Sequence, residues 1–143
     1  INEITVSLGL TRYKDLFKVI LTDRGSEFSK ADEIENFTEK DVSLERGKIF
    51  YCDAMQSWQK AEIENAHRNI RLYLPKGTSF NSLTQSDLNK MFSHIANYPI
   101  ESLNGRTPYE AYSFYFSHKD LESFGINKVD IEHVIRKPIL LKQ

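Results

Sequence analysis

Short apolar runs alternate along the chain with longer polar stretches in which apolar residues recur at helical spacing. Two runs, 18–23 and 48–53, have the length and composition of buried parallel strands. Helical spacing or helix-start residues mark the stretches 2–9, 12–17, 31–37, 58–74, 84–98, those after 107, and 117–125. This alternation predicts an α/β fold.

Several expected helix ends carry recognisable capping residues. Thr84 with Asp87, and Thr107 with Glu110, have the spacing of a capping box, in which side chain and backbone groups satisfy one another at a helix start. Pro75 cannot continue a helix, so the helix that begins near residue 58 should end before it. Thr11 is the expected cap between the first two helices, 2–9 and 12–17.

Two strands cannot form a stable sheet alone. Either further strands lie in the acidic segment 30–47 or in the mixed tail 126–143, or the sheet is incomplete in this chain. The first residue is not methionine, so we expect the natural start of the protein to lie upstream.

The composition of the 143 residues, 40% hydrophobic and 27% charged, is ordinary for one soluble domain. No apolar run approaches the roughly 20 residues that cross a bilayer, and the start lacks a signal-peptide pattern. Cys52, the single cysteine, excludes an intrachain disulfide and fits a cytoplasmic protein with a small buried thiol. The net charge of −1 lacks the basic excess of a free-standing DNA-binding domain, and it leaves nucleic acid undecided.

Two acidic residues occupy positions suited to metal binding. Asp23 ends the first expected strand, at the edge where open α/β sheets place ligands, although aspartate is also common in strand-ending turns. Glu64 shares a helix stripe with His67, Arg68 and Arg71, so it either binds metal or forms a surface ion pair with one of the arginines. Carboxylates from a strand end and a helix suit Mg²⁺, and paired Mg²⁺ ions support phosphodiester displacement.

Four short segments, taken in order, resemble the motifs of one protein family. They read LTDRGSEF at 21–28, SWQKAEIEN at 57–65, IR and LPKGTSF at 70–71 and 74–80, and NYP and LNGRTPYE at 97–99 and 103–110. The first is similar to the second-aspartate motif of DDE transposases and retroviral-type integrases, and the second to their glutamate motif. The others are similar to segments of one group of bacterial insertion-sequence transposases, the "thirty" family. The match covers residues 1–116, with 117–143 as a C-terminal extension.

The resemblance implies specific roles. Asp23 would be the second catalytic aspartate and Glu64 the catalytic glutamate, with Glu62 as the nearby alternative. His67 and Arg71 would lie near the metal or the DNA phosphates. Lys60, Arg68 and Lys76 would be candidates for phosphate contact. Each of these five residues is otherwise explained as solvated helix surface.

The departures from the family pattern concern the sheet and the spacer. No residue before Asp23 fits the family's first catalytic aspartate, which lies on an early strand. The resemblance therefore implies an RNase H-like, integrase-like fold truncated at its N-terminus, with an incomplete sheet in a single partial catalytic core, 1–143. The spacer between Asp23 and Glu64 is longer than usual, as though an acidic insertion had entered at 30–47. We expect the isolated chain to be inactive, and its exposed strand edge to pair with another chain.

The function that the resemblance implies is DNA transposition and integration. It would proceed by metal-dependent phosphodiester cleavage and strand transfer with two Mg²⁺ or Mn²⁺ ions. Transposon ends and target DNA would be the partners of a homo-oligomer in the bacterial cytoplasm, associated with the nucleoid and not with a membrane. The alternative is a non-catalytic protein-interaction or dimerisation module derived from a transposase.

Two apolar clusters have no part in the expected chemistry. One is a stripe on the helix 58–74, which should pack on the sheet and consists of Ile63, Ala66, Ile70, Tyr73 and Leu74. The other is an aromatic group made of Tyr112, Phe114, Tyr115 and Phe116. We interpret the aromatic group as core or as an oligomer contact rather than as a base-stacking platform.

Overall fold

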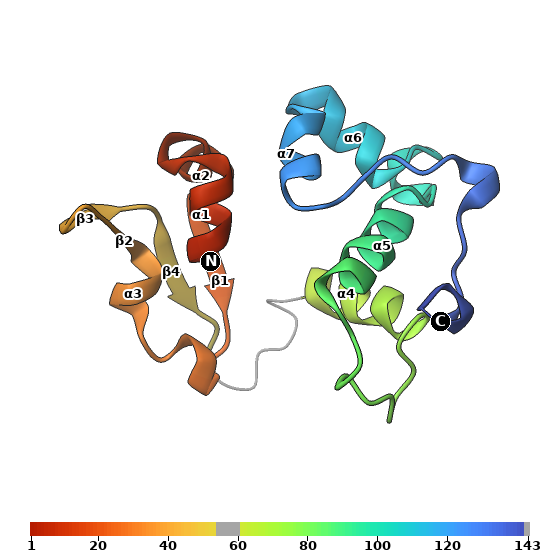
Figure 1. The fold of residues 1–143 in the computed structure, drawn as a ribbon, viewed down its shortest axis with the longest axis horizontal. Helices are drawn as coiled ribbons and strands as arrows, with labels where there is room; N and C mark the ends of the chain where they lie inside the picture. The colour runs from red at the N-terminus through yellow and green to blue at the C-terminus, as the bar shows by residue number, and fades with distance from the viewer. Residues whose placement is uncertain (54–60, 142–143) are drawn as a thin grey trace. The chain divides into compact units, whose positions relative to one another are not determined.

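The computed structural model describes residues 1–53 and 61–141, and it divides the chain into two compact units, Ile1–Glu62 and Ile63–Gln143 (Figure 1). The mixture of helices and strands confirms the predicted α/β class, whereas the single-domain assignment stays a prediction. Within the described part of the chain, every helix is too short or too polar to cross a membrane.

The first unit combines three short helices with four short strands. In order these are α1 (Asn2–Leu8), α2 (Leu10–Leu16), β1 (Val19–Thr22), the 3-10 turn η1 (Ser26–Phe28), α3 (Ala31–Glu35), β2 (Asn36–Glu39), β3 (Val42–Glu45) and β4 (Lys48–Tyr51). Strands β1 and β4 pair in parallel, with Thr22 level with Tyr51. Both strands lie where the apolar runs predicted them.

A single glycine separates α1 from α2. Gly9 has a φ of 77°, a backbone conformation that glycine adopts at little cost and that interrupts the helix. The amide of Tyr13 then donates to the Gly9 carbonyl at 2.9 Å and starts α2. The predicted cap, Thr11, is wrong, because Thr11 lies inside the first turn of α2 and not before it.

The acidic segment contains a hairpin that the sequence pattern left open. Strands β2 and β3 pair antiparallel, and the two residues between them, Lys40 and Asp41, have φ values of 49° and 64°. Two consecutive positive φ angles are typical of a type I′ hairpin turn. The hairpin forms a sheet of its own, so among the described residues the parallel sheet has only β1 and β4.

The parallel sheet of β1 and β4 buries one face only. Thr22 and Ile49 are buried on that face. The alternate positions Val19, Leu21 and Phe50 are 61%, 45% and 55% exposed. The expectation of buried strands therefore holds for one face, although parallel sheets are usually covered on both.

The buried arginine Arg46 ties the hairpin to the helices of this unit. Its guanidinium donates to the carbonyls of Ile34 and Glu33, both at 2.6 Å, and to the side chains of Asn2 and Thr5 at 2.6 and 3.2 Å. These partners lie in or beside α1 and α3, so one side chain joins three segments that are distant in the sequence.

The second unit is helical. Its elements are α4 (Ala61–Arg71), α5 (Gln85–Ala96), η3 (Glu101–Leu103), α6 (Pro108–Tyr115), α7 (His118–Ser123) and the 3-10 turns η4 (Ile131–His133) and η5 (Pro138–Leu141). Both predicted capping boxes are confirmed: Asp87 N donates to Thr84 Oγ1 at 3.2 Å, and Glu110 N donates to Thr107 Oγ1 at 3.1 Å. Helix α4 ends at Arg71, earlier than predicted, because the amides of Leu72 and Tyr73 donate to the carbonyls of Asn69 and Ile70, three residues back, which tightens the last turn.

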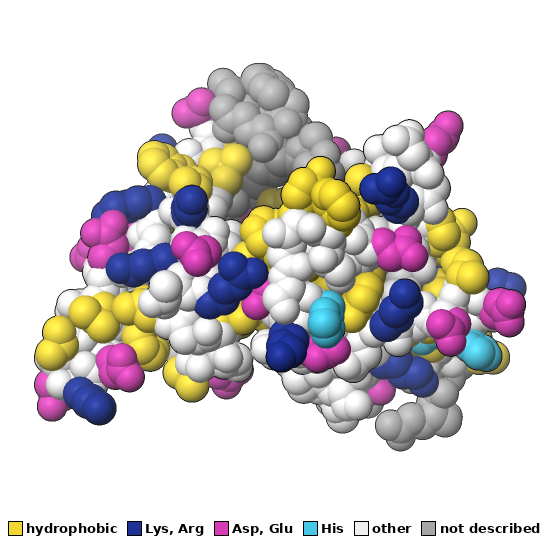
Figure 2. Space-filling model, turned by 90° about the horizontal axis from the view of Figure 1, so that it is seen from above, with side chains coloured by type: hydrophobic (Ala, Val, Ile, Leu, Met, Phe, Trp, Pro, Cys, Tyr) yellow, Lys and Arg dark blue, Asp and Glu magenta, His cyan; other side chains and the backbone are white. Residues whose placement is uncertain are grey.

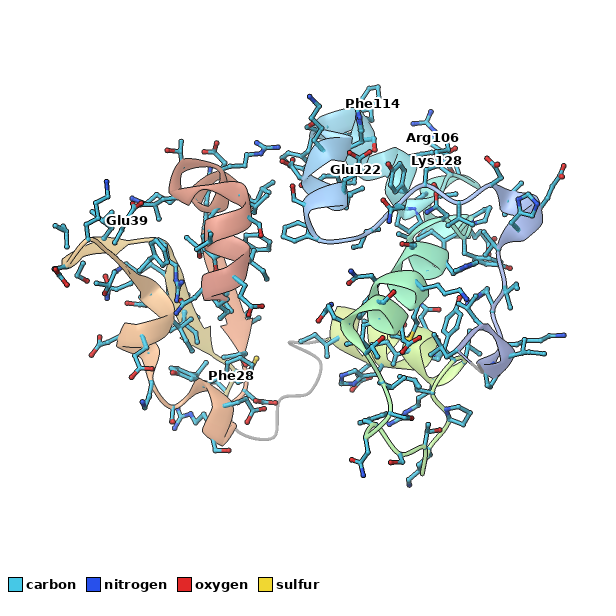
Figure 3. All side chains as sticks on the ribbon, viewed as in Figure 1. Phe28, Glu39, Arg106, Phe114, Glu122 and Lys128 are labelled. Carbon is cyan, nitrogen blue, oxygen red and sulfur yellow. The ribbon has the colours of Figure 1, made fainter. Side chains whose placement is uncertain are left out.

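The core of this unit lies between α4, α5 and the tail. Its buried residues are Tyr73, Leu74, Met91 and Leu140. The expected stripe is therefore fully buried only at its C-terminal end, in the turn that follows α4, and it packs against helices; Ile63 is 37% exposed. Of the two interpretations of the aromatic group, core packing does not hold for Phe114 (Figure 3) and Tyr115, which are 74% and 76% exposed, and the oligomer contact stays a prediction.

Candidate active site

Asp23 directly follows β1, at the carboxyl end of the parallel pair. The amide of Gly25 donates to its Oδ1 at 3.2 Å, which holds the carboxylate over the turn that ends the strand. The Asp23 side chain is exposed. The structure thus supports both readings, because the aspartate shapes the turn and its carboxylate also lies at the ligand-binding edge of the sheet.

The parallel pairing extends past Thr22 and brings a further carboxylate to this edge. The amide of Cys52, which is buried as expected, donates to the Thr22 carbonyl at 2.7 Å, so the next residue, Asp53, follows the end of β4 beside the turn. Asp53 is exposed. The family motifs do not single it out, but the parallel register alone could have.

The loop after Asp23 is fixed against β4. The hydroxyl of Tyr51 donates to the carbonyl of Phe28 at 2.5 Å, and Phe28 ends η1 (Figure 3). An added Cβ at Gly25 would lie 2.6 Å from a carboxylate oxygen of Glu27, which is the flexible end of an exposed side chain. The residues of the first motif therefore form a compact turn around the candidate ligand.

Helix α4 carries the second candidate carboxylate on an exposed stripe. Glu64, His67, Arg68 and Arg71 are all exposed. Within the described part of the chain, neither arginine forms an ion pair with Glu64, so the surface ion pair that would explain Glu64 without a metal is not formed. Arg68 and Arg71 lie in the last turn, where positive charge also stabilises a helix end.

A tight turn presents Lys76 just beyond this helix. The amide of Thr78 donates to the Pro75 carbonyl at 3.0 Å, which closes a β-turn of residues 75–78. Gly77, at the third position of this turn, has a φ of 89°, the positive value that a type II turn needs there. Lys76 occupies the second position and is exposed. The structure therefore adds a third cation after Arg68 and Arg71, while Lys60 lies outside the described residues.

The charges differ between the two units. Residues 1–53 contain 11 acidic and 8 basic residues, whereas residues 63–141 contain 8 acidic and 9 basic ones. Charged side chains of both signs are interspersed on the face drawn in Figure 2. Attraction of an anionic partner would therefore depend on local groups of cations such as the one after Glu64.

The candidate ligands come from both units, since Asp23 lies in the first and Glu64 in the second. No cluster of three or more His, Cys, Asp or Glu side chains suited to a metal occurs among the residues that the structure describes. The structure thus locates Asp23 after β1 and Glu64 on α4, each within its own unit.

Comparison with known proteins identifies the relationship. The chain is 31% identical, over 72% of its length, to the transposase of insertion sequence element IS4351 from Bacteroides fragilis. It is 29% identical, over 77% of its length, to the transposase InsI of IS30A from Escherichia coli K12. The chain is a relative of the insertion-sequence transposases.

The chain is also 27% identical, over 65% of its length, to a third transposase, that of IS1086 from Cupriavidus metallidurans. The chain spans less than a third of each of the three proteins, namely 29%, 27% and 25% of their lengths. No protein-family model matches it, and no solved structure matches it either. The predicted resemblance to the IS30-type insertion-sequence transposases is confirmed.

Proposed function

We propose that this chain forms part of the catalytic core of a DDE transposase with an RNase H-like fold. Asp23 is the second catalytic aspartate and Glu64 the catalytic glutamate. The observation that carries the proposal is that, in a relative of transposases, Asp23 ends a parallel strand at the edge where α/β sheets bind ligands. The exposed position of Glu64 beside His67 and two arginines supports the second assignment.

The side chains present fit a hard divalent cation, Mg²⁺ or Mn²⁺. Asp23 and Glu64 offer exposed carboxylates, and carboxylate oxygens are the protein ligands that these ions prefer. When bound, a pair of such ions activates the attacking oxygen and stabilises the leaving oxygen of a phosphodiester. The hydrogen bond from the Gly25 amide orients the Asp23 carboxylate before any ion arrives.

DNA is the proposed substrate, bound by the whole protein as transposon ends and target. A water molecule or a 3′-hydroxyl would attack phosphorus, and the 3′-oxygen of the attacked strand would leave. Attack by water would cut the strand, and attack by a 3′-hydroxyl would join that end to the attacked strand. Lys60, Arg68, Arg71 and Lys76 contact phosphates, because such contacts supply most sequence-independent affinity for DNA. His67, one turn after Glu64 on the same exposed stripe, would lie close to the phosphate or the metal if these bind there.

Metal binding by the chain itself is the direct test. Mn²⁺ titrated into labelled protein should broaden the amide NMR signals around Asp23 and around Glu64. Asp23→Asn should remove the first effect and Glu64→Gln the second, because each change deletes a charged ligand and keeps its shape. Asp41→Asn, at the hairpin turn, and Glu101→Gln, in η3, are matched controls. In both, Mn²⁺ should broaden the signals around Asp23 and Glu64 as it does in the unchanged chain. If the broadening is the same in both site variants as in the unchanged chain, the assignment of Asp23 and Glu64 as metal ligands is refuted.

Exposed apolar residues support a second candidate, a protein-interaction or dimerisation module without catalysis. Val19, Leu21 and Phe50 form an uncovered sheet face, and Phe114 with Tyr115 an uncovered helix end. Exposed apolar patches mark interaction sites. Concentration-dependent dimers in sedimentation, lost in Phe50→Ser or Phe114→Ser and unaffected by Mn²⁺, would favour this candidate over the first.

A further inference from the structure

One side of α5 carries a stripe of polar residues that is largely buried. Lys90, Ser93, His94 and Asn97 are spaced i, i+3, i+4 and i+7, so they share one side of the helix. Ser93, His94 and Asn97 are buried, although residues of these types are more often exposed or partly exposed. The opposite side of α5 packs through Leu88 and Ile95 on the apolar core. The helix therefore packs through buried or partly buried residues on both of these sides.

The tail that follows α7 covers the polar stripe through its own backbone. Asn127 donates its amide to Ser93 Oγ at 2.9 Å, and its carbonyl accepts from Asn97 Nδ2 at 2.9 Å. Further along the tail, the amide of Ile135 donates to His94 Nδ1 at 3.1 Å.

The last of these backbone contacts brings the tail to the core. Lys90 Nζ donates to the carbonyl of Leu140 at 3.0 Å, and the Leu140 side chain is part of the core between α4 and α5. Figure 1 shows the tail passing along α5 and ending beside α4.

Arg136 extends this attachment from α5 to α4. Its Nη2 donates to Asn69 Oδ1 in α4 at 3.0 Å, and its guanidinium carbon lies 3.8 Å from the centre of the Tyr98 ring, just after α5. A planar guanidinium can stack on a ring and bond through its edge at the same time, which a lysine cannot reproduce. One side chain therefore joins the tail, α4 and the end of α5.

The hydrogen bond from Arg136 to Asn69 affects the direction in which the exposed stripe of α4 faces. With about 100° between successive helical residues, Asn69 lies on the side of α4 opposite Glu64 and Arg71. Asn69 is partly buried and Glu64 is exposed, in agreement with this geometry. A contact that holds Asn69 therefore also sets the rotation of α4 about its axis, and with it the direction of the exposed stripe.

We propose that Arg136 is a positioning residue, which fixes the rotation of α4 so that Glu64 and its neighbouring cations face the metal and the DNA. This inference rests on the proposed function, because the rotation matters to a reaction only if that stripe meets the substrate. Arg136 itself touches neither partner. Its effect passes through Asn69.

Hydrogen exchange of the α4 amides tests the clamp independently of function. Arg136→Ala should speed the exchange of residues 69–74 about fivefold, the equivalent of the roughly 1 kcal/mol of a cation–π contact. Asn69→Ala should act in the same direction, and the double variant should add little, because residues in contact are not additive. Arg136→Lys should restore part of the protection. Lys137→Ala, which removes a neighbouring exposed cation, is the matched control and should leave exchange unchanged.

Binding of a duplex oligonucleotide in the presence of Mg²⁺, followed by fluorescence anisotropy, tests positioning. Arg136→Ala should weaken binding about fivefold, and Arg136→Lys should recover part of it. Leu121→Ala, which removes a buried side chain of α7 away from α4, lowers stability without touching the clamp. If it weakens DNA binding as much as Arg136→Ala does, the positioning role is overturned.

Two further outcomes separate this inference from the proposed function. If the unchanged chain binds DNA and metal but Arg136→Ala alters neither α4 exchange nor binding, the positioning role is overturned and the proposed function stands. If Arg136→Ala loosens α4 but the unchanged chain binds neither DNA nor Mn²⁺, the proposed function fails. The positioning role is then overturned with it, and only the structural clamp remains.

Discussion

Arg46 is 2% exposed, and its guanidinium bonds to uncharged oxygens of Asn2, Thr5, Glu33 and Ile34. Burial lowers the pKa of Arg46 from its usual value, and the nearby Tyr13 opposes that effect. Arginine stays protonated nonetheless, so all of its nitrogens act as donors. This hydrogen-bonded side chain therefore occupies the buried position at the junction of the hairpin and two helices, where an apolar side chain would be more usual.

We expect Arg46→Met to destabilise the chain by about 3 kcal/mol or more, because several buried oxygens lose a charged donor. Urea unfolding followed by circular dichroism measures this change. Arg24→Met, at an exposed position of the loop after β1, is the control and should remain within about 0.5 kcal/mol of the unchanged chain. An equally small effect for Arg46→Met would show that the hydrogen bonds of this arginine contribute nothing net.

At the scale of elements, attachment of the tail to α5 should depend on pH through His94. Burial lowers the pKa of His94 below its ordinary value, with the ammonium of Lys90 as the smaller cause. Arg136 adds a further positive charge in the tail, next to Ile135. The neutral ring accepts the Ile135 amide at Nδ1, and protonation would turn this acceptor into a donor that faces another donor.

The pKa of His94 is lower in the folded chain than its value of 6.5 in the unfolded chain. The neutral ring therefore contributes its full stability above pH 6.5, and that contribution is lost as the pH falls through the pKa of the folded chain. Amide exchange of residues 127–141 should therefore accelerate as the pH falls below 6.5, after correction for the intrinsic rate. His94→Asn keeps an acceptor near the Nδ1 position and binds no proton, so its corrected exchange should be independent of pH. The same pH dependence in this variant would place the titrating group elsewhere.

Elements whose signals are local could be predicted from the sequence. The capping boxes of α5 and α6 need only residues three positions apart, and both helices begin where Thr84 and Thr107 place them. The hairpin of β2 and β3 was not assigned, since its strands are four residues long and its turn uses Lys40 and Asp41 in place of the usual Asn-Gly. The sequence could not decide between core packing and an oligomer contact for Phe114, because helical spacing reveals a stripe but not whether a neighbour covers it.

For the whole molecule, the net charge of −1 means that any affinity for DNA depends on a few local cations. Each phosphate contact contributes about 0.9 to the slope of log affinity against log salt for duplex DNA. Arg68→Gln, Arg71→Gln and Lys76→Gln should each lower that slope by about this amount. Lys14→Gln, on exposed α2, is the control. Slopes that do not change in the three site variants would mean that this group of cations does not contact the DNA.

The candidate site was predicted from the sequence only in part. Short motifs identified Asp23 and Glu64. The structure places the first at a strand end, as expected, and the second on an exposed helix side. The polar stripe on α5 and its contacts with the tail were not foreseen. Their partners lie 30 to 50 residues apart in the sequence, a separation at which no periodic pattern connects them.

The hairpin of β2 and β3 also has a consequence for how proteins of this kind diverge. Its turn, Lys40 and Asp41, is exposed and lies in a sheet separate from the pair that holds Asp23. Residues gained or lost there lengthen or shorten the spacer to Glu64 without shifting the register of β1 and β4. We therefore expect a change of length to be tolerated better at this turn than within β4.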